Sequence, residues 1–261
     1  MKAKVNGIET NYEIHGKEGA PWLTFSHSLA CSLRMWDGQV AAFKDRFRIL
    51  LYDTRGHGES EAPEGPYSLD MLAEDLRQLL AEVRIKRTHY VGLSMGGMIG
   101  QVFTLTDPGT FDRVVLADTG HAQTPETRKQ WDERINTAKT KGMEPLVQPT
   151  MERWFTKDFR DNPAAKKIAQ LIRNTPVPGY VGCCQAISNL NTTARLKDIK
   201  RPVLAIAGEQ DAAAPGTRYI GENVPGAKLV MIPQAAHIAN IEQAEAFNRA
   251  LREFLSSPAS A

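Results

Sequence analysis

The sequence of 261 residues is poor in cysteine and has no long apolar run. Two of its three cysteines, Cys183 and Cys184, are adjacent, so a disulfide framework is excluded. We expect all three, Cys31 included, to be buried thiols in a reducing cytoplasm. No stretch of about 18 apolar residues is present, which argues against a membrane-spanning helix. The first residues lack an apolar segment, so we expect no signal peptide.

A strong charge of one sign is also missing. Lys and Arg total 32, Asp and Glu total 30, and the formal net charge is +2. Because the basic residues are spread through the chain, we expect no nucleic-acid partner. The sequence has no Cys-x-x-Cys motif and no histidine spacing typical of metal ligands, so we expect neither a metal nor a cofactor. A chain of this length forms one large α/β domain, or one such domain with a small insertion.

Apolar strands alternate with helices in the first 118 residues. We expect an antiparallel hairpin with strands over 2–6 and 11–15 around a turn at 7–9, a two-turn helix ending at Phe43, and a helix capped by Ser68. The remaining strands are expected over Trp22–Ser26, Phe47–Asp53, His89–Val91 and Phe111–Asp118. This alternation predicts a mostly parallel sheet with right-handed crossovers, and a binding site at the carboxyl ends of its strands.

The alternation stops between residues 121 and 196. Helices are predicted there over Glu126–Lys141, Leu146–Phe155, Ala164–Asn174 and Tyr180–Leu190. The alternation then resumes with Val203–Gly208, a helix near Arg218–Glu222, Lys228–Ile232, a final helix over Glu242–Leu255 and a loose tail over Ser256–Ala261. We therefore expect residues 1–120 and 197–261 to form an α/β core. Residues 121–196 would be a helical lid, inserted between two strands within one structural domain.

The stretch Gly92-Leu93-Ser94-Met95-Gly96 lies between a short apolar strand and a helix that runs to about Leu105. G-x-S-x-G in this strand–turn–helix context is typical of a nucleophile elbow. The two glycines leave room for a serine on a very tight turn. The turn also points a helix N-terminus at whatever the serine attacks. The motif predicts Ser94 as a nucleophile.

A serine hydroxyl needs a base that takes its proton, and the chain has six histidines. His237 follows the last predicted strand, in a loop at the carboxyl edge of the sheet, and is the predicted base. His15 and His89 lie in or beside strands, which favours packing roles. A hydrogen bond that braces its loop is the better interpretation of His57, and the role of His121 stays open.

The base in turn needs an acid that orients it. Asp211 follows the strand over 203–207 and gives the order Ser, Asp, His typical of an α/β-hydrolase. Asp118, also at a strand end, is the alternative acid. An oxyanion formed during the reaction needs two N–H donors. We expect these to be the backbone N–H groups of Met95 and Leu29.

The chain resembles the α/β-hydrolase superfamily along nearly its whole length, and more narrowly the 3-oxoadipate enol-lactonases. The likeness is carried by Ser28-Leu29 with Met35-Trp36, by residues 52–58 and 92–97, by Arg153-Trp154-Phe155-Thr156, and by residues 236–242 with Phe247-Asn248. Residues 30–32 depart from the small and polar residues usual in that loop. The resemblance implies a serine hydrolase of the β-ketoadipate pathway, which degrades aromatic compounds.

The resemblance also implies a substrate, a small enol-lactone with a free carboxylate. A buried carboxylate needs a cation or several donors. Arg153 beside Trp154 is our preferred substrate-binding pair, and Arg134 and Lys139 are the alternatives. A carboxylesterase or a carbon–carbon bond hydrolase of the same fold is the main alternative function. A ligand receptor without catalysis is more remote, because it would have a damaged triad. Whether the protein is a monomer or a homo-oligomer stays open.

Overall fold

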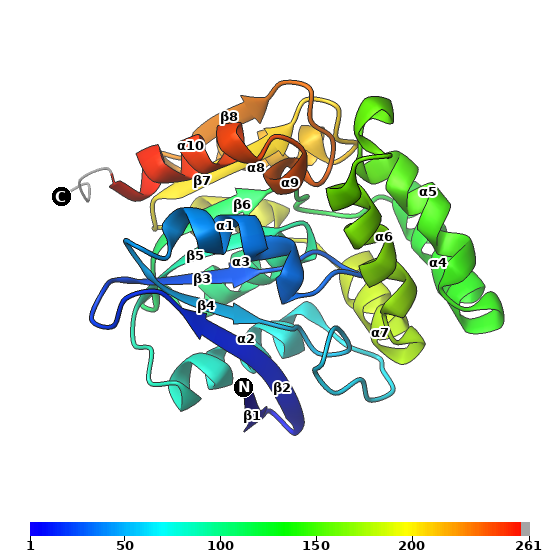
Figure 1. The fold of residues 1–261 in the computed structure, drawn as a ribbon, viewed down its shortest axis with the longest axis horizontal. Helices are drawn as coiled ribbons and strands as arrows, with labels where there is room; N and C mark the ends of the chain where they lie inside the picture. The colour runs from blue at the N-terminus through cyan, green and yellow to red at the C-terminus, as the bar shows by residue number, and fades with distance from the viewer. Residues whose placement is uncertain (257–261) are drawn as a thin grey trace.

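The computed structural model describes residues 1–256 and places an eight-stranded sheet at the centre of the molecule (Figure 1). The strands, in chain order, are β1 (Lys2–Val5), β2 (Ile8–His15), β3 (Trp22–Ser26), β4 (Arg48–Tyr52), β5 (Thr88–Leu93), β6 (Phe111–Ala117), β7 (Val203–Gly208) and β8 (Lys228–Ile232). Their order in the sheet is β1-β2-β4-β3-β5-β6-β7-β8. Only the pairs made by β2 are antiparallel, so the predicted mostly parallel sheet is confirmed.

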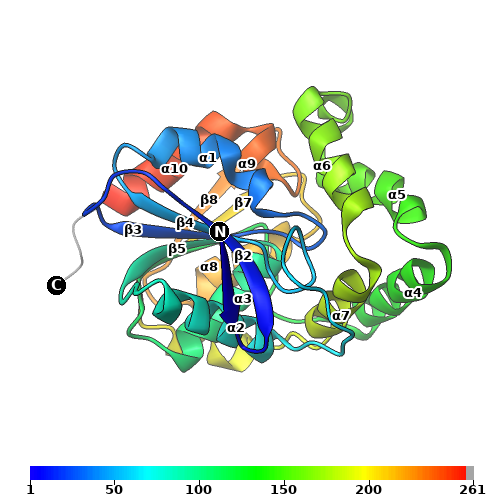
Figure 2. The ribbon, with the colours of Figure 1, turned by 60° about the horizontal axis from the view of Figure 1, so that its bottom comes forward.

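Helices cover both faces of the sheet (Figure 2). One face carries α1 (Asp37–Phe43), α9 (Ala239–Glu242) and α10 (Ala244–Ser256), and the other carries α2 (Leu69–Glu82), α3 (Met95–Thr106) and α8 (Ala214–Asn223). The central strands are therefore buried on both sides, and Val114, Val115 and Leu116 of β6 have no exposed surface. Each such side chain contributes about 1.5–3 kcal/mol by its burial. This packing fixes the strand ends, where the predicted site residues lie.

Residues 121–196, here called the helical insertion, lie between β6 and β7 in the sequence. In space they stand to one side of the sheet (Figures 1 and 2). The insertion contains α4 (Pro125–Lys141), α5 (Glu144–Trp154), α6 (Pro163–Asn174) and α7 (Val177–Ser188). Two short 3-10 helices, Lys157–Phe159 and Thr193–Asp198, follow α5 and α7, and a third lies before α1 in the core at Leu33–Trp36. All four predicted helices of this segment are present. The helix α7 begins three residues earlier than predicted, because Pro178 is accepted within its first turn.

The first hairpin turns one residue earlier than predicted. Val5 pairs with Ile8, so the turn consists of Asn6 and Gly7, and β2 begins at Ile8. Both turn residues have a positive φ, 45° for Asn6 and 80° for Gly7. This is the conformation that Asn-Gly adopts readily between two antiparallel strands.

The final helix is two helices rather than one. The predicted span over 242–255 is broken at Gln243, where φ is −126° and ψ is 55°, so α9 ends at Glu242 and α10 begins at Ala244. A helix pattern alone does not reveal such a break, because the apolar spacing continues across it. Of the predicted tail over 256–261, Ser256 closes α10 and the rest lies outside the described residues.

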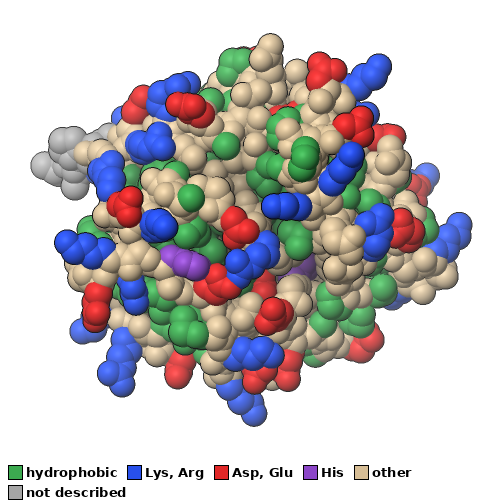
Figure 3. All heavy atoms as spheres, in the orientation of Figure 1, with side chains coloured by type: hydrophobic (Ala, Val, Ile, Leu, Met, Phe, Trp, Pro, Cys, Tyr) green, Lys and Arg blue, Asp and Glu red, His purple; other side chains and the backbone are tan. Residues whose placement is uncertain are grey.

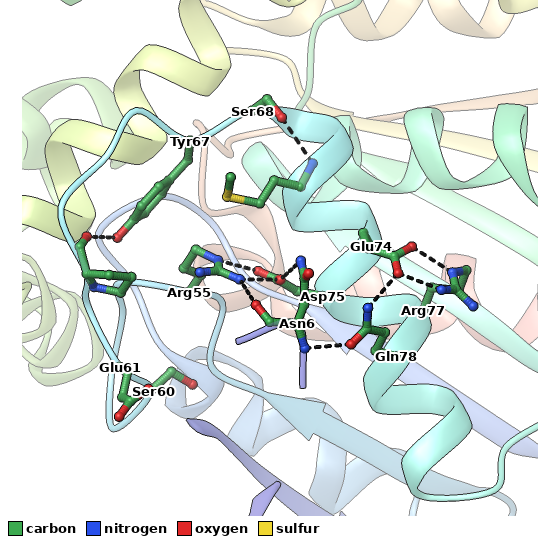
Figure 4. Close-up of polar contacts among 12 residues, drawn as sticks. Asn6, Arg55, Ser60, Glu61, Tyr67, Ser68, Glu74, Asp75, Arg77 and Gln78 are labelled. Atoms are coloured by element: carbon green, nitrogen blue, oxygen red, sulfur yellow. Dashed lines mark hydrogen bonds and ion pairs between the residues drawn. The ribbon is translucent and has the colours of Figure 1, made fainter. Parts of the chain in front are cut away.

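The loop after β4 joins the core to the helical insertion. Arg55 is buried and forms an ion pair with Asp75 of α2, with Nη2 and Oδ1 2.6 Å apart, and it also donates to the carbonyl of Asn6 (Figure 4). The next residue, Gly56, packs directly against Gly179 of α7. A Cβ atom on Gly179 would lie 2.0 Å from the Gly56 carbonyl oxygen. The loop is thus fixed to the core through Arg55, and through Gly56 it supports α7.

The surface shows no concentration of one charge on the face drawn in Figure 3, where Lys and Arg are interspersed with Asp and Glu. Within residues 1–256, no helix combines the length and apolar character that crossing a membrane requires. Cys31, Cys183 and Cys184 are buried and free, as predicted.

Candidate active site

Ser94 lies on the turn between β5 and α3. Its backbone has φ 56° and ψ −113°, a conformation that is strained for a residue with a side chain. The turn is very tight, since a Cβ atom on Gly92 would lie 2.3 Å from the Gly96 oxygen, and one on Gly96 would lie 2.2 Å from the Ser26 oxygen. The spacing of the two glycines therefore follows from close backbone contact. The Ser94 N–H donates to the carbonyl of Ala117 in β6, which fixes the turn to the neighbouring strand.

His237 and Asp211 are in contact at the ends of β8 and β7. The ring nitrogen Nδ1 of His237 lies 2.9 Å from Oδ1 of Asp211. The Asp211 side chain is 2% exposed and that of His237 is 12% exposed. Burial alone would raise the pKa of Asp211, but the charge and hydrogen bond of His237 outweigh it, and the pKa is lowered. An ionised Asp211 that holds Nδ1 leaves Nε2 as the nitrogen that can act as a base.

One cavity of about 410 Å³ joins these residues to the helical insertion. Ser94, Asp211, His237 and Leu29 line it from the core, and Arg153 and Trp154 line it from α5. Met95 is buried beneath as the first residue of α3, so its backbone N–H lies at the N-terminus of that helix. The structure therefore brings the seven predicted site residues to one place.

The loop that carries Leu29 is braced by two buried histidines. Ala30, at φ 56°, donates its N–H to Nε2 of His57 over 2.9 Å. Nε2 of His27 accepts the Thr54 N–H over 2.9 Å, and its Nδ1 lies 2.7 Å from the carbonyl oxygen of Ser28. His57 therefore has the predicted bracing role.

Both bracing histidines are neutral for the same reason. Burial lowers the pKa of His27 to about 4 and that of His57 to about 3. A neutral ring can accept a backbone N–H, and a charged ring cannot. The three remaining histidines do not line the cavity. His15 contacts Glu13, the ring of His89 packs edge to face with Phe47, and His121 stacks on Tyr219.

The end of α5 is attached to the loop that carries His237. Glu242 is buried, and its Oε1 accepts both the N–H and the hydroxyl of Thr156. Its Oε2 accepts the N–H of Ala236, the residue before His237, over 2.8 Å. The centroid of a Trp154 ring lies 5.7 Å from that of His237. Two stretches that are far apart in the sequence, 153–156 and 236–242, thus form one contact.

Two arginines line the side of the cavity formed by the insertion. Arg153 donates to Thr150, and Arg134 lies over the ring of Trp131 at 4.4 Å from its centroid. Within the part of the chain that the structure describes, neither arginine has a carboxylate partner. Burial and the neighbouring Arg134 charge lower the pKa of Arg153 to about 10, so it stays protonated at neutral pH. A cavity with two unpaired cations suits an anionic ligand.

Lys139, the third candidate cation, does not line this cavity. The residues of α4 that do are Thr127, Gln130, Trp131 and Arg134, which share one face of the helix. Lys139 follows Arg134 by five positions, which turns it away from that face. Trp131 and Tyr180 also line the cavity and were not among the predicted site residues. The pairing of Trp131 with Arg134 at helical spacing is the signal that could have found the first of them.

Comparisons with known proteins show the family to which the chain belongs. Residues 21–244 match the family model described as the alpha/beta hydrolase fold, and the chain belongs to that family. The chain is 36% identical to 3-oxoadipate enol-lactonase 2 from Acinetobacter baylyi over 94% of this chain and 92% of that protein.

Among solved structures, the enol-lactonase from Burkholderia xenovorans LB400 shares 38% identity, with a TM-score of 0.94 over 98% of this chain and 100% of that one. A thermophilic esterase from Thermogutta terrifontis shares 25% identity, with a TM-score of 0.92 over 100% of this chain and 99% of that one. The predicted resemblance to α/β-hydrolases and enol-lactonases is confirmed.

Proposed function

We propose that the protein opens the ring of an enol-lactone that bears a free carboxylate, with 3-oxoadipate enol-lactone as the substrate and 3-oxoadipate as the product. One observation carries this proposal: a serine and a histidine–aspartate pair share a cavity with two arginines that lack carboxylate partners. The serine and the histidine–aspartate pair are what cleavage of an ester bond needs. The arginines are what binding of a substrate carboxylate needs. The similarity to two enol-lactonases supports the same assignment.

The first half of the reaction forms an acyl-enzyme. Nε2 of His237 takes the proton of the Ser94 hydroxyl, whose oxygen attacks the lactone carbonyl. Asp211 holds the ring at Nδ1 and stabilises the imidazolium that forms. The N–H groups of Met95 and Leu29 would receive the oxyanion. The N–H groups on both sides of Leu29 already have partners, Met35 Sδ for Ser28 and His57 for Ala30, which supports Leu29 as the free donor in this loop.

The second half releases the product. Collapse of the tetrahedral intermediate breaks the ring C–O bond, and His237 returns its proton to the departing enol oxygen. The enol stays attached to the acyl group and converts to the ketone, which makes its departure easier than that of an alkoxide. His237 then takes a proton from water, whose oxygen attacks the acyl carbon. Collapse of this second intermediate breaks the bond to Ser94, and His237 returns the proton to the serine oxygen.

The helical insertion would act as the lid and the carboxylate-binding wall. Arg153 lies next to Trp154, which packs near His237, so a carboxylate bound by Arg153 would hold the lactone ring beside the nucleophile. Removal of water by the insertion would strengthen the charged contact. Arg134 lines the same wall and would add to the positive field.

The experiment is hydrolysis of 3-oxoadipate enol-lactone, generated from muconolactone, beside hydrolysis of a neutral p-nitrophenyl ester. We expect the wild type to prefer the lactone in kcat/KM, and Ser94→Ala to hydrolyse neither. Good turnover of the simple ester without turnover of the lactone would overturn the substrate assignment. That result would favour a carboxylesterase, the second candidate, which the similarity to the Thermogutta terrifontis esterase supports.

A further inference from the structure

Two buried carboxyl groups meet at the carboxyl ends of β6 and β7. Asp118 follows β6 with no exposed surface, and Asp211 lies in the loop after β7 at 6% exposure. β6 and β7 are neighbours in the sheet, and Asp118 accepts the N–H of Gly208, three residues before Asp211, so the two carboxyl groups lie side by side. Both line the cavity that contains Ser94.

Each carboxyl group has one oxygen with protein donors and one without. Oδ1 of Asp118 accepts the Gly208 N–H over 2.8 Å. Oδ1 of Asp211 takes both the His237 ring and the Ala213 N–H. Oδ2 of each is buried and makes no hydrogen bond within the described residues. The N–H of Ala239 also acts on Asp118 and lowers its pKa, but less than burial and the Asp211 charge raise it. Two ionised carboxylates would leave both Oδ2 atoms unsatisfied and two negative charges side by side. One shared proton removes both problems.

We infer that Asp118 is a positioning residue that keeps a proton on Oδ2 and donates it to Oδ2 of Asp211, which stays ionised beside His237. The inference deepens the proposed function and rests on the role of Asp211 as the acid that orients His237. With Oδ1 on the histidine and Oδ2 on Asp118, the Asp211 carboxylate cannot rotate away from the ring. The pair also carries a single negative charge, which matches the single charge of the imidazolium.

The surroundings decide which carboxyl keeps the proton. Asp211 has the imidazole of His237 beside it, from the loop after β8, whereas Asp118 faces the Asp211 charge itself. Burial and that charge raise the pKa of Asp118 well above its ordinary value, while the pKa of Asp211 is lowered. The other charged groups on this cavity are Arg134 of α4 and Arg153 of α5, on the wall formed by the insertion.

The stability of Asp118→Asn against pH gives a test that needs no substrate. An unfolded chain releases the Asp118 proton above about pH 4, whereas the folded protein keeps it. The folded state then binds more protons, so the wild type loses stability relative to Asp118→Asn as pH rises above about 5. The ratio of the two unfolding constants should change by about tenfold per pH unit. Parallel curves of stability against pH would overturn the inference.

A second test compares the activities of Asp118→Ala and Asp118→Asn. It uses a p-nitrophenyl ester, so that the identity of the lactone does not matter. Asp118→Ala should lower kcat by about tenfold, because it leaves Oδ2 of Asp211 without a donor. In Asp118→Asn the amide can donate to Asp211 and accept from Gly208, so most of that loss should be restored. Equal losses in the two variants would overturn the inference.

Carbon-13 NMR of the wild type covers the case in which a variant does not fold. One aspartate carboxyl resonance should keep the position of a protonated acid at pH 7. Its absence would contradict the shared proton. Neither the stability arm nor the NMR arm depends on catalysis, so failure of the inference is distinguishable from failure of the proposed function.

Discussion

The two walls of the cavity are built differently. The wall from the sheet carries Ser94, Asp118 and Asp211 at the ends of strands that are buried on both faces, and short hydrogen bonds connect neighbouring strand ends. The opposite wall is formed by α4 and α5 with smaller contributions from their neighbours. In α4, a helix of 17 residues, Ala138 is buried and the remaining residues are partly or fully exposed. Under the proposed function, the chemistry that needs fixed distances would lie on the rigid wall, and recognition of the substrate carboxylate would lie on the more exposed wall.

The helical insertion is itself divided. The helix α7 packs onto the core through Gly179, and the end of α5 is attached to the His237 loop through Thr156 and Glu242. By contrast, α4 packs mainly against α5 and α7 of the insertion itself. Movements that admit substrate are therefore expected in α4 before α7, because local opening begins where few apolar contacts are buried.

The largest effect is expected on the rigid wall. His237→Ala should lower kcat by about 10⁴- to 10⁶-fold, since triad members act as a unit. The loss should be the same for the lactone and for a p-nitrophenyl ester, because proton transfer serves both. Steady-state kinetics with both substrates check this, with the melting temperature as a control for folding. A loss confined to the lactone would mean that His237 binds substrate and is not the base.

The second effect concerns the contact between core and insertion. Gly179→Ala should destabilise the protein by about 3 kcal/mol, because the new methyl group would overlap the Gly56 carbonyl and rigid backbone must move. Urea unfolding measures the change. Gly38→Ala in α1 is the matched control: no atom lies within 4 Å of its Cβ position, so it should be neutral or stabilise by up to about 1 kcal/mol. Equal effects of the two variants would show that α7 is not anchored at this point.

The sequence predicts the cavity wall formed by the sheet better than the wall formed by the helical insertion. Ser94, Asp211 and His237 could be chosen as candidates from the sequence because each depends on a local rule: a glycine-spaced turn, or a loop that follows an apolar strand. The structure places all three on one cavity. The position of Asp118 and Asp211 at neighbouring strand ends of one cavity was not predicted. Both were treated as rival acids, since their proximity depends on β6 and β7 being neighbours in the sheet. That order is a property of the whole fold.

The wall formed by the insertion could be predicted only in part. The spacing of apolar residues and prolines gave its four helices, but not the angles at which they pack. Arg153 was preferred only for its neighbour Trp154, with Arg134 and Lys139 as alternatives, and the structure places Arg153 and Arg134 on the cavity. The resemblance to enol-lactonases included residues 153–156 and 236–242 as separate stretches. Their contact through Glu242 was visible only in three dimensions.

A third prediction tests the wall formed by the insertion. Arg153→Ala should raise KM for the carboxylate-bearing lactone by about tenfold or more, the size expected for loss of a hydrogen bond to a charged group. KM for a neutral ester of similar size should change little. Lys139→Ala removes the same charge outside the cavity and serves as the control. An equal rise for the lactone and the ester would show that Arg153 supports the shape of the cavity and does not recognise the carboxylate.

The smallest effect is expected where the two walls meet. Glu242→Gln should lower stability by about 1 kcal/mol, because the amide oxygen can still accept from Thr156 while the amide nitrogen faces the Ala236 N–H without accepting from it. The lost hydrogen bond is to Ala236, the residue before His237, so kcat should fall by a few-fold for the lactone and the ester alike. Thr156→Val removes one donor from the same carboxylate and should lower kcat less than Glu242→Gln. If Glu242→Gln altered KM for the lactone and left kcat unchanged, the attachment of α5 would serve substrate binding, and the division between the two walls would not hold at this contact.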